Sequence, residues 1–399
     1  SKDLVKWEFV GWAFPEIPHE AVEWVRSHAD GKGATNIWAP YIIPFGDKYR
    51  LYYCVSAFGL KTSYIGLAES ASPEGPWMQR GCVVKTDATS VMNAIDPSII
   101  ADSATGKWWM HYGSFFGGLY CVELNPETGL PVQEGDQGHL IARRATYWKD
   151  NLEAPEIIYN PELKQYYLFV SYDPLMTTYN VRVGRSDKAE GPFVDYFGVE
   201  LKDTTNNFPI LTAPYRFNNH PGWAGTAHCA VFTSDEGQYF MAHQGRLSPH
   251  NQMMDLHLRQ VFFTSDGWPV VSPERYTGSA SRKFSAADIV GEWEIIRVQE
   301  PAYERQLQAG QILWGEGQLK NEEWNVSCTL SLKKDGQLDE NKGYWKFAER
   351  GQLLSLTLNG ESVDNLLVFA GHDWENETET VLFTGLDSRG RSVWGKRTK

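Results

Sequence analysis

Apolar and polar positions alternate along this chain in short runs, and four of the runs resemble one another. Each of the four follows a turn and is rich in aromatic residues. Their first aromatic residues are Tyr49, Trp108, Tyr166 and Tyr239, which are 59, 58 and 73 residues apart. Alternation with a period of two predicts β-strands, and recurrence at this spacing predicts a repeated structural unit.

Each aromatic run has companion segments that also read as strands. Apolar segments precede the four runs at residues 41–43, 97–100, 157–159 and 229–232, and two runs lead through a third strand to similar tails at 70–77 and 186–193. Several strands per unit, without amphipathic helices between units, predict the blades of a β-propeller rather than a parallel α/β sheet. A large β-sandwich with accidentally similar hairpins is the alternative.

The first blade is expected to be incomplete in these 399 residues. Residues 1–7 resemble the two tails, and Tyr41 precedes the tail at Ser70 by 29 residues. The corresponding position of the first blade therefore falls about 29 residues before Ser1. We expect an N-terminal fragment or a partner chain to complete that blade.

The repeat ends after Gly278, which divides the chain into two predicted domains. Residues 1–278 are assigned to the propeller and residues 279–285 to a short polar linker. Residues 286–399 contain short alternating strands with Asp-Gly and Asn-Gly turns, which predict a small antiparallel β-barrel or sandwich. We expect a binding or stabilising role for this accessory domain.

Composition excludes several classes of function. The formal net charge is −13, which disfavours nucleic acid as a partner, and no apolar run is long enough for a membrane helix. The five cysteines show no C-x-x-C spacing, so neither a zinc cluster nor a disulfide framework is indicated. The 16 Trp, 19 Tyr and 19 Phe suit a strand-rich core, and such rings also stack on sugars.

Two acidic residues stand directly before predicted strands. Asp96 lies in the segment 93–98 and Glu153 in the segment 152–157, at positions that look equivalent in successive blades. Because the innermost strands of a propeller line a central channel, both carboxyls are expected at one mouth of that channel. Paired carboxyls in a pocket suit glycosidic bond cleavage, whereas a lone Asp-Pro is more often a turn at a strand entry.

Other residues offer weaker signals. Ser114 has no obvious base and reads as a polar pocket contact or a turn residue. His228 stands at the equivalent strand start of the last blade, where either a structural role or an axial metal ligand is open. The chain has no G-x-S-x-G, H-E-x-x-H or phosphate-cradling Gly-rich motif.

Several motifs in order resemble the arabinanases of glycoside hydrolase family 43, and the C-terminal segments resemble the accessory β-barrel of its two-domain endo-arabinanases. The resemblance covers nearly the whole chain. Its segments are 36–40, 94–98, 153–155, 225–228, 256–260 and 266–271, followed by 373–376, 383–386 and 393–396.

This resemblance implies a five-bladed β-propeller that hydrolyses glycosidic bonds with inversion and uses three essential acids. Glu153 resembles the general acid, and Asp96 resembles the acid that tunes and orients it. The family's general base lies in a His-Asp-Pro motif at the start of blade one, which is expected outside this chain. The resemblance also places His228 beside a channel-bound calcium ion, and Tyr41 departs from the family by replacing an Asp.

We therefore predict a secreted or periplasmic glycosidase that cleaves α-1,5-L-arabinofuranosyl linkages of arabinan or arabino-oligosaccharides. Trp38, Asn93, Ser114 and Phe115 are the predicted sugar-facing residues. Three alternatives stay open: a catalytically silent arabinan-binding protein, a base delivered by another chain, and an exo-acting arabinanase or xylosidase on the same scaffold.

Overall fold

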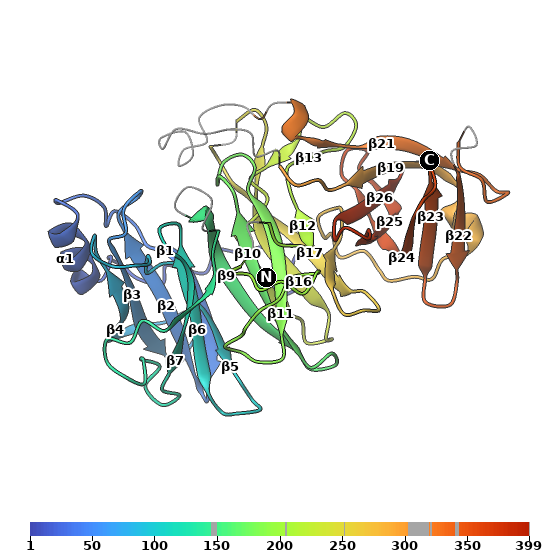
Figure 1. Cartoon of the computed structure of the whole chain (residues 1–399). Coiled ribbons are helices and arrows are strands. Elements are labelled where there is room, and N and C mark those ends of the chain that lie inside the picture. Colours follow the sequence, from blue (N-terminus) through green and yellow to red (C-terminus); the bar gives the residue numbers. More distant parts are fainter. Residues whose placement is uncertain are drawn as a thin grey trace. The chain divides into compact units, whose positions relative to one another are not determined.

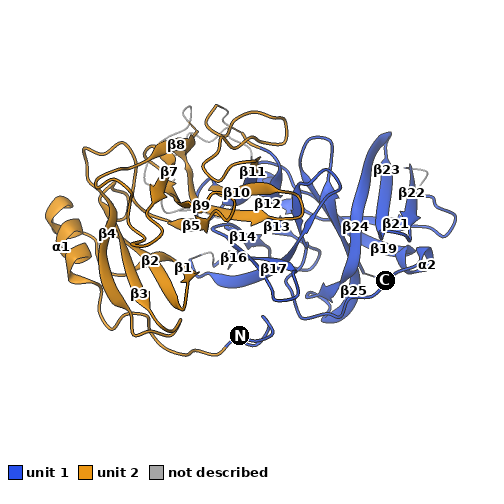
Figure 2. Ribbon diagram, turned by 90° about the horizontal axis from the view of Figure 1, so that it is seen from below, with its two compact units in different colours: residues 1–7, 172–183, 208–399 blue, residues 8–171, 184–207 orange. Residues whose placement is uncertain are grey.

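The structure is a computed structural model that describes residues 1–144, 150–203, 206–250, 252–301, 319, 321–339 and 343–398. The chain forms two compact units (Figure 2). Unit 1 comprises Ser1–Trp7, Tyr172–Val183 and Phe208–Lys399, and unit 2 comprises Glu8–Ser171 and Gly184–Asn207. None of the helices in the described part of the chain has the length and apolar character needed to span a bilayer.

Unit 2 contains two four-stranded antiparallel sheets whose strands pair in chain order, as the repeat predicts (Figure 1). In each sheet the aromatic run forms the second strand, and the tail at 70–77 is the turn before the fourth strand of its sheet. The strands are β1 (Trp38–Phe45), β2 (Lys48–Ser56), β3 (Ser63–Ser70) and β4 (Met78–Thr86), then β5 (Ser98–Ala101), β6 (Trp108–Ser114), β7 (Gly118–Leu124) and β8 (His139–Ala142).

Two further sheets follow the same pattern. One of them is a four-stranded sheet with the strand order β12-β11-β10-β9, and the division between units 1 and 2 passes within β11. In the other, β15 to β18 pair in sequence, and β14, β13 and β20 extend the sheet from β16. Their strands are β9 (Leu152–Asn160), β10 (Gln165–Tyr172), β11 (Asn180–Ser186), β12 (Ile210–Thr212), β13 (Tyr215–Arg216), β14 (Trp223–Ala224), β15 (Ala230–Thr233), β16 (Tyr239–Leu247), β17 (Asp255–Phe263) and β18 (Pro269–Val271).

Helix α1 (His19–His28) departs from the predicted all-strand pattern. Ala21 and Val25 are fully buried and share a hydrophobic cluster with Tyr53 and Tyr64 of the first sheet. One face of the helix therefore covers strands β2 and β3. The apolar signal spans only about one helical turn, which is too short to separate helix from strand by periodicity.

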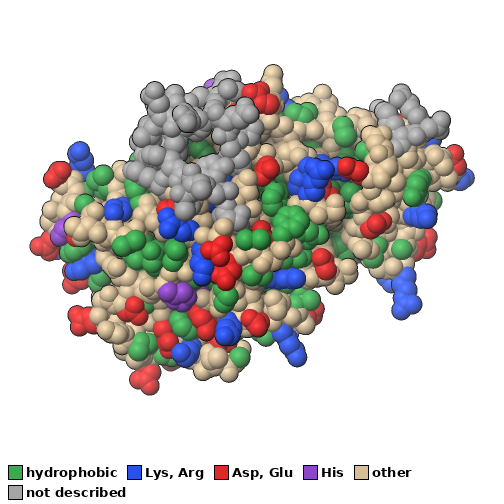
Figure 3. Space-filling model, viewed as in Figure 1, with side chains coloured by type: hydrophobic (Ala, Val, Ile, Leu, Met, Phe, Trp, Pro, Cys, Tyr) green, Lys and Arg blue, Asp and Glu red, His purple; other side chains and the backbone are tan. Residues whose placement is uncertain are grey.

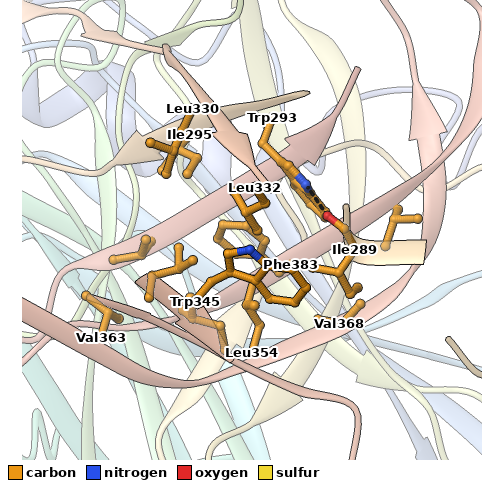
Figure 4. Close-up of a cluster of buried hydrophobic side chains, with 14 of the residues drawn as sticks. Ile289, Trp293, Ile295, Leu330, Leu332, Trp345, Leu354, Val363, Val368 and Phe383 are labelled. Atoms are coloured by element: carbon orange, nitrogen blue, oxygen red, sulfur yellow. Dashed lines mark hydrogen bonds between the residues drawn. The ribbon is translucent and has the colours of Figure 1, made fainter. Parts of the chain in front are cut away.

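The C-terminal segment forms one seven-stranded sheet in the order β21-β19-β26-β25-β24-β23-β22, preceded by the short helix α2 (Ala286–Ile289). Its inward positions alternate along the strands, and Trp293, Trp345 and Phe383 are central to the buried cluster (Figure 4). The elements are β19 (Gly291–Arg297), η2 (Asn321–Glu323), β20 (Asn325–Val326), β21 (Cys328–Leu332), β22 (Gly343–Ala348), β23 (Leu353–Leu358), β24 (Glu361–Asp373), β25 (Thr378–Leu386) and β26 (Ser392–Arg397).

Within unit 1 this sheet is joined to the preceding repeats by backbone pairing and a buried ionic cluster. Strand β20 pairs in parallel with β13, where Tyr215 faces Asn325. The fully buried ammonium of Lys396 bonds to the carboxylates of Glu274, Asp373 and Glu375. The predicted boundary at residues 279–285 stays a prediction, because unit 1 includes segments on both sides of it.

Candidate active site

Asp96 lies in a strained and buried position at the entrance to β5. Its backbone has φ +57°, and only 6% of the residue is exposed. The Ala154 N–H donates a hydrogen bond of 3.1 Å to Asp96 Oδ2. Burial raises the pKa of Asp96 to about 7, although the Ala154 N–H acts in the opposite direction. A carboxyl group in this setting changes protonation near neutral pH.

The backbone that follows Glu153 lies beside Asp96, but the two residues are not at equivalent positions. Each of the four sheets enters its first strand through a residue with positive φ, at Ala39, Asp96, Ala154 and His228. Ala154, not Glu153, is therefore the counterpart of Asp96, and the predicted register is wrong by one residue. The Asp96 carboxylate nevertheless bonds to the peptide that joins Glu153 to Ala154, so the two acidic residues are close neighbours.

A hydrogen-bonded link between β5 and β9 holds these two residues together. Ser98 Oγ donates to Glu156 Oε2 at 2.8 Å and accepts from the Ile157 N–H at 3.1 Å. The Tyr41 phenol also lies at this link, where burial and the Glu156 carboxylate raise its pKa. Tyr41 thus packs between neighbouring sheets.

The predicted sugar-facing residues Asn93 and Ser114 are buried and bonded to each other. Ser63 Oγ donates to Asn93 Oδ1 at 2.6 Å, and Asn93 Nδ2 donates to Ser114 Oγ at 3.0 Å. Because Asn93 precedes Asp96 by three residues, this network fixes the loop that leads into the carboxyl site. Phe115 is only 6% exposed, which leaves little ring surface for stacking on a sugar.

Trp38 is the most accessible of the predicted sugar-facing residues. Its ring is half-buried and meets the exposed ring of Phe58 edge-on, with centroids 6.1 Å apart. The Trp38 carbonyl accepts a 2.9 Å hydrogen bond from Cys54 Sγ. Burial and the Asp96 carboxylate both raise the pKa of this thiol, so Cys54 stays neutral between Trp38 and Asp96.

The structure also reveals site residues that sequence reasoning missed. Cys54, Ser63 and the Ala154 N–H support the predicted residues, and Glu156 closes the link between sheets. The signal for Glu156 was present in the Glu-Ala-Pro-Glu segment at 153–156. Backbone donors such as the Ala154 N–H carry no sequence signature, because every residue except proline has one.

His228 lies in unit 1, at a strand entrance with φ +53°. Calcium prefers six to eight oxygen ligands, whereas an imidazole offers nitrogen. Among the described residues, the group of three acidic, His or Cys side chains close enough to share an ion is Glu274, Asp373 and Glu375. Lys396 already bonds to all three. The described residues bring no such carboxylate cluster to His228, and the calcium ion stays a prediction.

Comparison with known proteins identifies related chains. Residues 1–269 match the model of glycosyl hydrolases family 43, and residues 273–395 match that of a C-terminal lipocalin-like domain. An extracellular endo-α-(1→5)-L-arabinanase of Thermotoga petrophila is 29% identical, covering 100% of this chain and 88% of that protein. An extracellular exo-α-(1→5)-L-arabinofuranosidase of Cellvibrio japonicus is 32% identical over an alignment that covers 71% of this chain and 82% of that protein.

Solved structures give the same result. The crystal structure of endo-1,5-α-L-arabinanase from Thermotoga petrophila matches with a TM-score of 0.80 and 27% identity, over 95% of this chain and 87% of that one. The fold class predicted from the sequence, a five-bladed β-propeller followed by a small β-barrel or sandwich domain, is thereby confirmed. The strand pattern, the neighbouring acids and a family model that spans most of the length agree: the chain belongs to glycosyl hydrolases family 43.

Proposed function

We propose that this protein cleaves the α-1,5-L-arabinofuranosyl linkages of arabinan with inversion of configuration. The observation that carries the proposal is the hydrogen bond from the Ala154 N–H to Asp96, which holds the peptide between Glu153 and Ala154 against the Asp96 carboxyl group. The arabinanases of Thermotoga petrophila and Bacillus subtilis support the choice of substrate. A structure of the Cellvibrio cellulosa α-L-arabinanase complexed with arabinohexaose also matches, with a TM-score of 0.58 and 31% identity.

In this proposal Glu153 is the general acid. Its proton passes to the glycosidic oxygen while the bond between that oxygen and the anomeric carbon breaks, and water forms the new bond from the opposite face. Asp96 lies beside Glu153, and an ionised Asp96 disfavours a second negative charge there, which keeps a proton available for donation. A further carboxylate must accept the proton of the attacking water.

The proposed substrate is an uncharged polysaccharide, so its binding does not require a surface that is mainly positive or mainly negative. In Figure 3 acidic and basic side chains are interspersed over the face in view. Trp38 and the neighbouring Phe58 are the accessible rings of the described site and are proposed to contact sugar. Because a polymer such as arabinan does not enter cells, we also propose a secreted or periplasmic location, as the names of the extracellular relatives suggest.

The test is Glu153→Gln, which keeps the size of the side chain and removes its acidic proton. We expect hydrolysis of debranched arabinan, measured as reducing-sugar release, to fall about 10²–10⁴-fold while binding to arabinan persists. Glu162→Gln is the matched control, because Glu162 is exposed on the turn between β9 and β10. Unchanged hydrolysis by Glu153→Gln would refute the assignment.

The same assay separates the alternatives. Binding without sugar release by the unmodified chain identifies a silent arabinan-binding protein, and mass measurement of the intact assembly reveals a partner chain that supplies the base. Chromatography of the products distinguishes internal cleavage from release of single sugars, and xylan hydrolysis in place of arabinan hydrolysis identifies a xylosidase.

A further inference from the structure

The C-terminal sheet encloses a cavity that the catalytic proposal does not use. The cavity measures about 670 Å³ and is lined by residues of β19, β20, β21, β23, β24 and β26, together with adjoining loop residues. Its volume lies within the range of about 300–1,000 Å³ that is usual for small-molecule sites. The lining residues are Ile295, Arg297, Gln299, Trp324, Asn325, Val326, Cys328, Leu330, Leu356, Leu358, Asn359, Glu361, Val363 and Val393.

The position of the cavity follows from the alternation of inward residues along the strands. On β19 the inward positions are Trp293, Ile295 and Arg297, and on β23 they are Leu354, Leu356 and Leu358. All four of Trp293, Leu354, Ile295 and Leu356 belong to the buried core, and of these only Ile295 and Leu356 also line the cavity. The rings of Trp293, Trp345 and Phe383 (Figure 4) do not line the cavity, whereas aliphatic members of the same cluster do, together with the Trp324 ring.

The chemistry of the lining changes from the floor to the rim. The floor is aliphatic, with Ile295, Leu330, Leu356, Val363 and Val393 each at most 9% exposed. A sugar placed there would leave its hydroxyl groups without hydrogen-bond partners, at a cost of about 1–3 kcal/mol for each group. The floor therefore favours an apolar molecule over a carbohydrate.

The rim is polar but electrically balanced. Arg297 Nη1 lies 3.0 Å from Glu361 Oε2, and Arg297 Nε lies 3.7 Å from Asp387 Oδ2. Asp387 is shared with Arg391, whose Nη2 lies 2.7 Å from Asp387 Oδ2. Within the described part of the rim, the two carboxylates therefore face two cations, which disfavours an anionic head group. The amide of Asn359 provides hydrogen-bonding groups for a neutral polar end, whereas the Gln299 amide already bonds to Arg391 Nη1 and to the Arg297 carbonyl.

We propose that this cavity is a binding site for a neutral, mostly apolar small molecule, whose apolar body fills the aliphatic floor and whose polar end meets the rim. The site is distinct from Asp96 and Glu153, which belong to unit 2. It gives the accessory domain a binding function that is independent of sugar cleavage.

The experiment uses the full chain and the neutral fluorescent probe N-phenyl-1-naphthylamine. We expect saturable binding of one probe per chain, with fluorescence enhanced by the apolar surroundings. Leu358→Trp places an indole in the cavity and should weaken probe binding at least tenfold. Tyr344→Trp is the matched control, since Tyr344 lies on the neighbouring strand β22, is 47% exposed and does not line the cavity; it should change binding less than twofold.

Cys328 provides a second readout. It is an exposed free cysteine in the lining of the cavity, whereas Cys54, Cys121 and Cys229 are buried. Bound probe should slow the reaction of Cys328 with a thiol reagent, and Cys328→Ser should remove the protected signal. If Leu358→Trp does not fold, Cys328→Trp at the exposed rim replaces it.

Three results would overturn the proposal: absence of saturable probe binding, equal binding by Leu358→Trp and the wild type, and protection of Cys328 by arabinohexaose but not by the probe. The last result would assign the cavity to a carbohydrate. Hydrolysis of arabinan by the same samples reports separately on the catalytic site.

Discussion

At Asp96, burial and a left-handed backbone conformation both raise the free energy of the native state. A non-glycine residue in this conformation costs about 1–3 kcal/mol, and the raised pKa shows that the ionised carboxylate is unfavourable there. The surrounding contacts offset these costs. A carboxyl group with these costs is expected at a functional site, where its placement serves the chemistry and not the stability of the fold.

Asp96→Asn tests this account with two measurements on one variant. The native pKa of about 7 exceeds the unfolded value of 3.8, so the native state binds the extra proton between these pH values, and wild-type stability declines as pH rises through that interval. Asn carries no such charge. The variant should therefore gain stability relative to wild type at pH 8 compared with pH 4.5, by up to a few kcal/mol.

Arabinan hydrolysis by the same variant should fall about 10²–10⁴-fold. Thermal unfolding at both pH values and reducing-sugar release are the two assays. Equal pH dependence of unfolding in variant and wild type would contradict the burial of an ionisable Asp96, and unchanged hydrolysis would contradict its place in the site.

The sequence predicts Asp96 and Glu153 as site residues because each acid stands directly before a predicted strand. The predicted alignment of the two acids is wrong by one residue. The equivalent residues are Ala39, Asp96, Ala154 and His228, and the only sequence feature that marks them is a following proline, which three of the four have. The sequence also could not show that Asn93 and Ser114 bond to each other, since that contact depends on loops brought together by neighbouring strands.

At the scale of elements, the link between β5 and β9 depends on one hydroxyl group. Ser98→Ala removes the donor to Glu156 and the acceptor for the Ile157 N–H, and leaves two buried groups without this partner. We expect a loss of about 1–3 kcal/mol in the free energy of unfolding, measured by urea denaturation. Ser72→Ala, which removes only a solvent-exposed hydrogen bond from the Glu74 N–H, should change the free energy of unfolding by less than about 0.5 kcal/mol.

Strands were predictable because aromatic runs and turns recur, whereas helix α1 was not. The helix owes its stability to tertiary burial of Ala21 and Val25 against β2 and β3, and a single turn of apolar spacing does not reveal that burial. The C-terminal sheet was predicted as a barrel or sandwich, but its cavity depends on which inward positions carry rings and which carry aliphatic side chains.

At the scale of the whole molecule, buried neutral histidines predict sensitivity to acid. Burial lowers the pKa of His111 to about 4 and of His243 to about 3, and lowers that of His257 well below 6.5. Below pH 6.5 the unfolded chain binds protons that the native state excludes, so each histidine reduces stability by about 1.4 kcal/mol per pH unit down to its native pKa. Asp96 has the opposite effect, because its raised pKa makes the native state more stable as pH falls from about 7 toward 3.8.

Replacement of one histidine isolates its share. His111→Gln retains a donor for the Ala189 carbonyl, and its thermal unfolding should depend less steeply on pH between 6.5 and 4 than that of the wild type. Parallel pH profiles for the two proteins would contradict a neutral, buried His111.

The ionic cluster around Lys396 predicts a large loss of stability from a single change. Lys396→Met leaves the buried carboxylates of Glu274 and Asp373 without their cation. We expect the free energy of unfolding, measured by thermal unfolding, to fall by about 3–5 kcal/mol. Lys333→Met, on the exposed turn after β21, is the control and should be close to neutral. An unchanged free energy of unfolding in Lys396→Met would show that the ionic cluster does not stabilise the fold.

The parallel pairing of β20 with β13 means that the boundary read from the repeat is a poor place to cut the gene. A protein truncated at Gly278 would lose the strand that extends the last repeat's sheet, and the backbone groups of Tyr215 and Arg216 that faced it would become an open edge. Such an edge invites pairing between molecules, so a shortened enzyme would be expected to precipitate at concentrations where the full chain stays dispersed.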